Sequence, residues 1–280
     1  MIRQADKIRR YYNSTATDYR FVWSGKDMPL HFGYYDESVA NHRESLSKMN
    51  EVVAKQAGIK KSDRVLDAGC GYGASCRWLA REFGCRVVGL TIVPRQIKKA
   101  QELTKEAGLS SKVTFRLEDY TKTSFADKSF DVVWGLESIL HAENKYKFIK
   151  EAFRLLKRKG RIVIAEYILQ ENLGKEDKKL IDKWMSGWAM PGVLTVNENQ
   201  KLLIKAGFKN IIFHDISDNV ARSIRRLGKM SKISLPIAKI FYKLKIFNRE
   251  RYRNLEVSLL HYKIFGKGLW KYMVVTAEKK

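Results

Sequence analysis

Cysteine is scarce in this chain: 280 residues contain only three. Cys70, Cys76 and Cys85 include no Cys-x-x-Cys pair, and their number is odd. A disulfide framework needs paired cysteines, and a structural zinc site needs ligands at close, regular spacing. The sequence therefore argues against both, and we expect no bound metal and a reducing, cytoplasmic environment.

Long apolar runs are missing as well. No segment approaches the roughly 18 consecutive apolar residues that a membrane-spanning helix needs, and the first six residues lack the apolar core of a signal peptide. The chain also has no internal repeat, low-complexity tract or flexible linker. Because 45% of the residues are nevertheless apolar, we expect a globular protein with a core of ordinary size.

Acidic residues are too few to balance the basic ones. The chain has 54 Lys and Arg but only 30 Asp and Glu, which gives a formal net charge of +24. Residues 222–280 contain 16 basic and three acidic residues, an excess of 13. An anionic membrane surface, a phosphorylated substrate or nucleic acid would match this charge. The alternative is that the lysines only keep the protein in solution.

Strand-like and helix-like patterns alternate through the middle of the chain. Apolar runs predict strands at 64–68, 86–91, 112–117, 130–135 and 161–168, and helical spacing predicts helices at 73–83, 94–107 and 145–156. Gly160 is expected to end the last of these helices. Two later strands, 210–216 and 270–277, would complete a doubly wound, mostly parallel α/β sheet of seven strands. Between them and the first five strands, Thr195 and Glu198 form a capping-box pattern for a helix at 196–206.

These patterns suggest three parts. A helical, aromatic-rich N-terminal cap (1–60) precedes a cofactor-binding core (61–169), and 170–280 completes the sheet. The basic segment at about 217–268 falls between the last two strands, which predicts an inserted lid.

Residues 236–247 of that segment have the spacing of an amphipathic helix, and two lysines, Lys239 and Lys243, lie off its apolar face. A basic amphipathic helix of this kind can lie on an anionic bilayer, or its stripe can pack on the protein itself. The apolar residues at helical spacing are Ile237, Ile240, Phe241, Leu244 and Phe247.

The most informative stretch is Val65-Leu66-Asp67-Ala68-Gly69-Cys70-Gly71-Tyr72-Gly73. A buried strand that leads into a glycine turn and then a helix brings backbone N–H groups up to a nucleotide-like ligand. Glycine suits such a turn because a Cβ would block the turn or the ligand. The pattern Asp-x-Gly-x-Gly-x-Gly differs from the Gly-x-Gly-x-x-Gly of dinucleotide folds. It resembles the first motif of class I S-adenosylmethionine-dependent methyltransferases, although a plain tight turn is the alternative.

The end of the second predicted strand indicates which group of this family the chain resembles. That family usually places an acid there, whereas this chain has Leu90-Thr91 followed by Pro94-Arg95-Gln96. This is similar to the Gly-Leu/Ile-Thr…Pro-x-Gln variant of the tocopherol and sterol C-methyltransferase group and its small-molecule relatives.

The resemblance implies S-adenosylmethionine as cofactor and a role for each motif. Asp67 and the turn with Gly69, Cys70 and Gly71 would hold the amino-acid end of the cofactor. Thr91 and Gln96 would bind the ribose, Asp119 would accept from the adenine amino group, and Tyr120 would line the adenine slot. Tyr19 would reach over the cofactor. A surface glutamine and an exposed turn acid are the alternatives for Gln96 and Asp119.

Glu137 and His141 are the candidates for catalysis. They are four residues apart, so a helical turn would place both on one face. A carboxylate and an imidazole there could orient a substrate or remove its proton, and the resemblance also implies a Glu and a His at this place. A capping Glu and a structural His are the alternatives, and His214 and His261 are expected to be structural.

The sequence thus predicts an S-adenosylmethionine-dependent methyltransferase that acts on a small or amphipathic acceptor of isoprenoid, sterol or lipid type, with optional peripheral contact to an anionic membrane. A polar amine or a phosphorylated metabolite is the alternative acceptor. Nucleic acid is not expected as a partner, because the chain has no Asn-Pro-Pro-Tyr-type motif and no recognition module. A cofactor-binding scaffold without catalysis is a further alternative.

Overall fold

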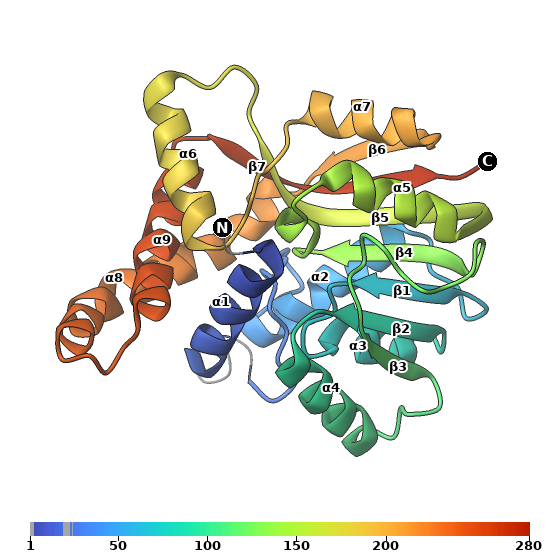
Figure 1. Ribbon diagram of the computed structural model, residues 1–280, viewed down its shortest axis with the longest axis horizontal. Coiled ribbons are helices and arrows are strands. Elements are labelled where there is room, and N and C mark those ends of the chain that lie inside the picture. The colour runs from blue at the N-terminus through green and yellow to red at the C-terminus, as the bar shows by residue number, and fades with distance from the viewer. Residues whose placement is uncertain (1–2, 19–22, 24) are drawn as a thin grey trace.

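The computed structural model describes residues 3–18, 23 and 25–280. Its centre is a seven-stranded sheet in the order β3-β2-β1-β4-β5-β7-β6, visible across the middle of Figure 1. β7 runs antiparallel to both of its neighbours, and the other pairs are parallel. The prediction of a seven-stranded, mostly parallel sheet is confirmed. The strands are β1 (Arg64–Ala68), β2 (Arg86–Thr91), β3 (Val113–Leu117), β4 (Phe130–Leu136), β5 (Leu156–Leu169), β6 (Lys209–Asp215) and β7 (Trp270–Glu278).

The sheet is buried on both faces, which explains why its strands were legible as apolar runs. Along β5, for example, Ile162 and Ile164 belong to one core cluster, and Val163 and Tyr167 belong to the other. α5 (Lys145–Leu155) and α7 (Val196–Ala206) contribute to the first cluster. The second receives side chains from α2 (His42–Gln56), α3 (Ala74–Glu82), α6 (Lys175–Gly187) and α9 (Arg249–Gly266).

α7 begins with the expected capping box. The Glu198 N–H donates to the Thr195 hydroxyl, and the Thr195 N–H donates to the Glu198 carboxylate. The helix ends at Gly207, whose φ of 102° lies in the left-handed region. The remaining helices of the described residues are α1 (Gln4–Asp18), α4 (Pro94–Glu106), α8 (Ser217–Lys243) and the short 3₁₀ helix η2 (Ile139–His141).

The expectation that Gly160 ends a helix is wrong. α5 stops at Leu155, and Leu156 already begins β5. The chain turns at Lys159, which has a positive φ of 60°, and the Lys159 N–H donates to the Lys279 carbonyl at 2.8 Å. The basic run before Gly160 therefore belongs to the sheet, because the C-terminal end of the chain supplies a partner that local spacing does not reveal.

The basic segment between β6 and β7 forms a helical hairpin of α8 and α9. Figure 1 shows the two helices side by side, extending away from the sheet next to α1 and α6. They approach closely at Gly228, where a Cβ would lie 2.5 Å from the Tyr262 ring. The division of the chain at residues 60 and 169 stays a prediction. In the described part of the chain, none of the helices has the length and apolar character needed to cross a bilayer.

Candidate active site

A cavity of about 610 Å³, which is the more polar of two neighbouring cavities and is named the polar cavity, lies where β1, β2, β3 and β4 end. The carboxyl ends of parallel strands meet at one edge of the sheet, so residues that follow different strands converge there. All of the predicted cofactor residues that the structure describes line this cavity, whereas Tyr19 lies outside the described residues. They are Asp67, Gly69, Cys70, Gly71, Thr91, Gln96, Asp119 and Tyr120.

The glycine turn after β1 has a backbone shape that a side chain at Gly69 would prevent. Gly69 has a φ of 95°, and a Cβ on it would lie 2.5 Å from the Ser138 Cβ. The N–H groups of Gly69 and Cys70 both donate to the Leu90 carbonyl, at 3.0 and 2.8 Å. Only the Gly71 N–H, of these three, makes no hydrogen bond to the described residues. Within residues 69–71, the Gly71 N–H is therefore the donor left for a ligand.

Asp67 is a buried acid with few partners. From the described residues, its carboxylate receives one hydrogen bond, from the Cys76 thiol at 3.1 Å. Burial raises the pKa of Asp67 to about 7. A cationic or hydrogen-bond-donating ligand in the cavity would supply the missing interactions and favour the ionised carboxylate.

Thr91 and Gln96 are joined to each other. The Thr91 hydroxyl donates to the Gln96 side-chain oxygen at 2.6 Å and accepts from the Val93 N–H at 3.2 Å. Gln96 is only 2% exposed, so the alternative of a surface glutamine is wrong. Because its oxygen is occupied, Gln96 offers the cavity its amide N–H₂ group.

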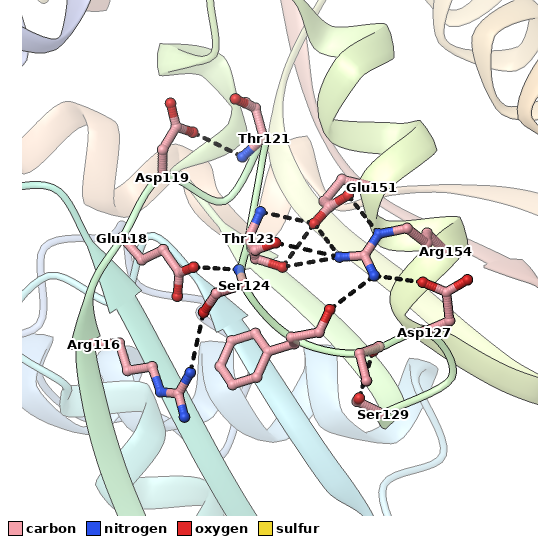
Figure 2. A network of polar contacts seen from close by, with 12 residues as sticks. Arg116, Glu118, Asp119, Thr121, Thr123, Ser124, Asp127, Ser129, Glu151 and Arg154 are labelled. Atoms are coloured by element: carbon pink, nitrogen blue, oxygen red, sulfur yellow. Dashed lines mark hydrogen bonds and ion pairs between the residues drawn. The ribbon is translucent and has the colours of Figure 1, made fainter.

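The loop between β3 and β4 carries Asp119 and Tyr120. Asp119 accepts from the Thr121 N–H at 2.8 Å, as a turn acid does, and the Tyr120 hydroxyl donates to the Ser138 carbonyl at 3.0 Å. Figure 2 shows how the far side of this loop is fixed by Arg154 of α5. Arg154 donates to the carbonyl of Phe125 and forms ion pairs with two acids, Asp127 and Glu151, at 2.6 and 2.7 Å.

A second, apolar cavity of about 420 Å³ adjoins the first. Its walls come from α1, the segment before α2, Tyr167 of β5, Trp188, and the α8–α9 hairpin. The two cavities have five lining residues in common: Tyr12, Leu30, His31, Glu137 and His141.

Glu137 lies at this junction. Its Oε1 accepts from the Phe32 N–H at 2.7 Å and from the Tyr272 hydroxyl at 2.8 Å, and its Oε2 accepts from the Tyr167 hydroxyl at 2.9 Å. A carboxylate offers about four acceptor positions, so the donors among the described residues leave one open. Burial raises the pKa of Glu137 to about 7, although these donors oppose the shift.

The helical turn expected to join Glu137 and His141 is not present. Glu137 has a left-handed φ of 49°, and the helix that follows is the single 3₁₀ turn η2. Backbone strain of this kind in a non-glycine residue is common at functional sites. The two side chains nevertheless line the same two cavities, because η2 brings His141 back toward the end of β4.

His141 is held as a neutral imidazole. Its Nδ1 lies 3.3 Å from the Ala189 carbonyl, and its Nε2 lies 2.9 Å from the Tyr12 hydroxyl. A carbonyl can only accept, so Nδ1 carries the proton and Nε2 accepts from Tyr12. Burial lowers the pKa of His141 to about 4, which favours a positioning role over proton uptake.

Two buried ionic groups hold η2 in place. The Lys145 ammonium donates to the carbonyls of Leu140 and Ala142 at 2.9 and 2.8 Å, and the Glu166 carboxylate accepts from the Leu140 N–H at 2.9 Å. Burial lowers the pKa of Lys145 and raises that of Glu166. Sequence reasoning missed this pair, and it missed Tyr12, Tyr167 and Tyr272 as partners of the catalytic candidates.

Comparison with known proteins agrees with this geometry. A family model described as "Methyltransferase domain" matches residues 66–164. The chain is 32% identical over 232 residues to the chloroplastic tocopherol O-methyltransferase of Arabidopsis thaliana, covering 76% of this chain and 66% of that protein. It is 31% identical over 214 residues to a sterol 24-C-methyltransferase of Saccharomyces cerevisiae, covering 75% and 54%.

This chain belongs to the class I S-adenosylmethionine-dependent methyltransferases. The predicted resemblance, including that to the tocopherol and sterol group, is confirmed. The chain spans 66% or less of the length of these two relatives.

The chain is also similar to a methyltransferase of a polar amine and to a solved cyclopropane synthase structure. A sarcosine/dimethylglycine N-methyltransferase of Halorhodospira halochloris is 29% identical over 232 residues, which cover 80% of each chain. The cyclopropane synthase MmaA2 of Mycobacterium tuberculosis has the same fold, with a TM-score of 0.84 at 14% identity over 100% of this chain and 99% of that one.

Proposed function

We propose that this methyltransferase moves a methyl group from S-adenosylmethionine to a largely apolar small molecule of isoprenoid, sterol or lipid type. The observation that carries the proposal is the junction between the two cavities. A polar cavity fitted to the cofactor meets an apolar cavity fitted to such an acceptor, and Glu137 and His141 line both.

The residues that line the polar cavity have the chemistry to hold the cofactor. Asp67, which is short of hydrogen-bond donors, would pair with the cationic amino-acid end, and the Gly71 N–H would bind its carboxylate. Gln96 would donate to the ribose, and Asp119 and Tyr120 would flank the adenine. When bound, S-adenosylmethionine supplies a methyl group already activated by its positive sulfur.

The apolar cavity favours an acceptor without phosphate groups. Among the described residues that line it, none is a lysine or an arginine. A phosphorylated acceptor would therefore enter without a cation to pair with, which is costly in a buried site. Aromatic walls, which include Tyr11, Trp23 and Trp188, suit an isoprenoid or a ring system.

Glu137 would serve as the proton acceptor. S-adenosylmethionine held by Asp67, Gly71 and Gln96 would supply its methyl group to an electron pair of the acceptor, and the electrons of the carbon–sulfur bond would stay on sulfur in S-adenosylhomocysteine. If the acceptor carries a proton that must leave, the free acceptor position of Glu137 would take it up. A pKa of about 7 suits a general base at neutral pH, whereas His141 would hold Tyr12 at the junction.

We also propose a cytoplasmic location. Its support is that all three cysteines are free and buried, as is usual in a reducing compartment.

Incubation with methyl-labelled S-adenosylmethionine, a lipid extract and a metabolite extract tests the proposal. We expect the label in an apolar product, and we expect Met230→Trp, which fills the apolar cavity, to reduce transfer while leaving S-adenosylhomocysteine binding unchanged. Ile212→Trp, on the exposed face of β6, is the matched control. Label in a polar amine or in nucleic acid would identify a different acceptor class and contradict the proposal.

A further inference from the structure

Exposed apolar side chains gather at one end of the molecule, the hairpin tip, which we define as residues 233–247 at the end of α8 and in the following loop. Eleven large apolar side chains are exposed among the described residues, and seven of them lie in the tip. Ile233, Leu244 and Ile246 are the most open, at 74%, 63% and 62%. The other four are Ile237, Ile240, Phe241 and Tyr242.

The same region is strongly basic. No acidic residue occurs from 219 to 249, a stretch that contains nine lysines and arginines. Lys239, Lys243 and Lys245 alternate with the apolar residues and are exposed. The tip therefore combines an apolar surface with a positive charge that nothing in this segment neutralises.

This surface is also the mouth of the apolar cavity. Ile233, Ile237 and Phe241 are exposed at the tip, and the same three side chains line the cavity. Phe247, which follows the end of α8, lines it as well. An acceptor that enters between them would pass from an apolar surface directly into an apolar cavity.

We propose that the hairpin tip docks on an anionic lipid bilayer and that the acceptor enters the cavity from the bilayer. A bilayer offers negative head groups for the lysines and an apolar interior for the isoleucines. A second copy of this chain is a poorer occupant, because tip-to-tip contact would bring two basic surfaces together. The role as an entry path rests on the proposed function, whereas the docking itself does not.

Cosedimentation of the full chain with phosphatidylcholine vesicles, with and without phosphatidylglycerol, tests the docking. We expect binding to the anionic vesicles that weakens as salt is raised. Leu244→Glu/Ile246→Glu should reduce this binding by roughly tenfold or more, because two charges replace apolar groups that would enter the bilayer. Lys243→Glu/Lys245→Glu should reduce it by a similar factor.

The matched control is Ile204→Glu/Ile212→Glu, which alters two equally exposed isoleucines outside the tip. It should leave vesicle binding unchanged. The proposal is overturned if anionic vesicles do not bind, or if the control loses as much binding as the tip variants. A dimer in sedimentation analysis that disappears in Leu244→Glu/Ile246→Glu, without vesicle binding, would assign the surface to a second copy instead.

Calorimetric titration with S-adenosylhomocysteine separates this proposal from the proposed function. Leu244 and Ile246 line neither cavity, so the tip variant should bind this ligand like the wild type. Vesicle binding without any methyl transfer would contradict the function and leave the docking intact. Methyl transfer to an apolar acceptor without vesicle binding would do the reverse.

Discussion

At the scale of single residues, the Glu137 carboxyl group combines burial with three donors and a place at the junction of two cavities. Burial raises its pKa to about 7, so it is ionised above that pH and protonated below it. A proton acceptor must be ionised, and we therefore expect kcat/KM to rise with pH up to about 7 and then level off. The pH profile of the labelled-product assay measures this directly.

Two variants identify the group that titrates. Glu137→Gln should lower kcat by roughly 10²- to 10⁴-fold, the usual contribution of a general base, and should remove the rise with pH. Tyr272→Phe deletes one donor to the carboxylate, so it should move the rise to higher pH. An unchanged profile in Glu137→Gln would show that Glu137 does not take up the proton.

Unlike Glu137, the buried His261 side chain has no hydrogen-bond partner among the described residues. It is fully buried, neither ring nitrogen has a hydrogen bond to the residues that the structure describes, and the ring stacks on Phe32 with centroids 5.3 Å apart. Burial holds the pKa of His261 well below its ordinary value of 6.5. The unfolded chain therefore binds a proton below about pH 6.5 that the folded chain does not, and this residue reduces stability as the pH falls.

We expect His261→Phe to match or exceed the wild type in free energy of unfolding, because an apolar ring of similar shape replaces an unsatisfied polar one. The gain should grow by up to about 1.4 kcal/mol for each pH unit below about 6.5. Denaturant unfolding at several pH values measures it, with His214→Phe on the exposed face of β6 as the control. A gain that does not depend on pH would contradict the assignment of a neutral, buried imidazole.

At the scale of elements, the position of η2 depends on Lys145, which donates to backbone carbonyls, and on Glu166, which accepts from the Leu140 N–H. Lys145→Met removes the hydrogen bonds to the carbonyls of Leu140 in η2 and of Ala142 directly after it, and it removes the positive charge that acts on Glu166. We expect a loss of about 2–4 kcal/mol in the free energy of unfolding and a lower kcat, since η2 carries His141. Calorimetric or denaturant unfolding measures the first effect, and the labelled-product assay the second.

Glu166→Gln provides the test of coupling, because an amide oxygen can still accept from the Leu140 N–H but carries no charge. Lys145→Met should therefore be milder in a Glu166→Gln background. Lys179→Met, at the exposed pair with Glu176, should leave stability within error. Equal losses with and without the Glu166 charge would contradict the electrostatic part of this account.

Elements governed by local pattern could be predicted from the sequence. β1 and β2 have the predicted ends because both faces of these strands are buried, and the helix at 196–206 follows from its own capping box. The beginning of β5 could not be predicted, since Leu156 pairs with Phe130 of β4 and the Lys159 N–H donates to the Lys279 carbonyl, both distant in sequence. The helical turn expected after β4 was wrong, because residue spacing does not reveal that the Glu137 backbone has a left-handed conformation.

At the scale of the whole molecule, the meeting of the candidate cofactor residues in one cavity was predictable, whereas the partners of Glu137 were not. Asp67, Thr91 and Asp119 converge because parallel strands end at one edge of the sheet, a rule that needs only strand positions. Phe32 of the segment before α2, Tyr167 of β5 and Tyr272 of β7 all donate to Glu137. Their meeting depends on the packed fold, and no spacing in the sequence encodes it.

Because the net charge is +24, we expect salt to have opposite effects on the stability of this protein and on its binding to anionic vesicles. Repulsion among like charges destabilises the compact state, and salt screens it. We therefore expect the unfolding midpoint to rise as sodium chloride is increased from low concentration, while binding to anionic vesicles falls. Thermal unfolding and cosedimentation in the same buffers measure the two trends.

Lys243→Glu/Lys245→Glu separates these effects from a general loss of folding. The variant has a lower net positive charge, so its midpoint at low salt should be at or above that of the wild type, although its vesicle binding falls. If both quantities fell together, the tip lysines would support the hairpin itself. Opposite changes would instead show that this positive charge destabilises the folded state and promotes binding to an anionic surface.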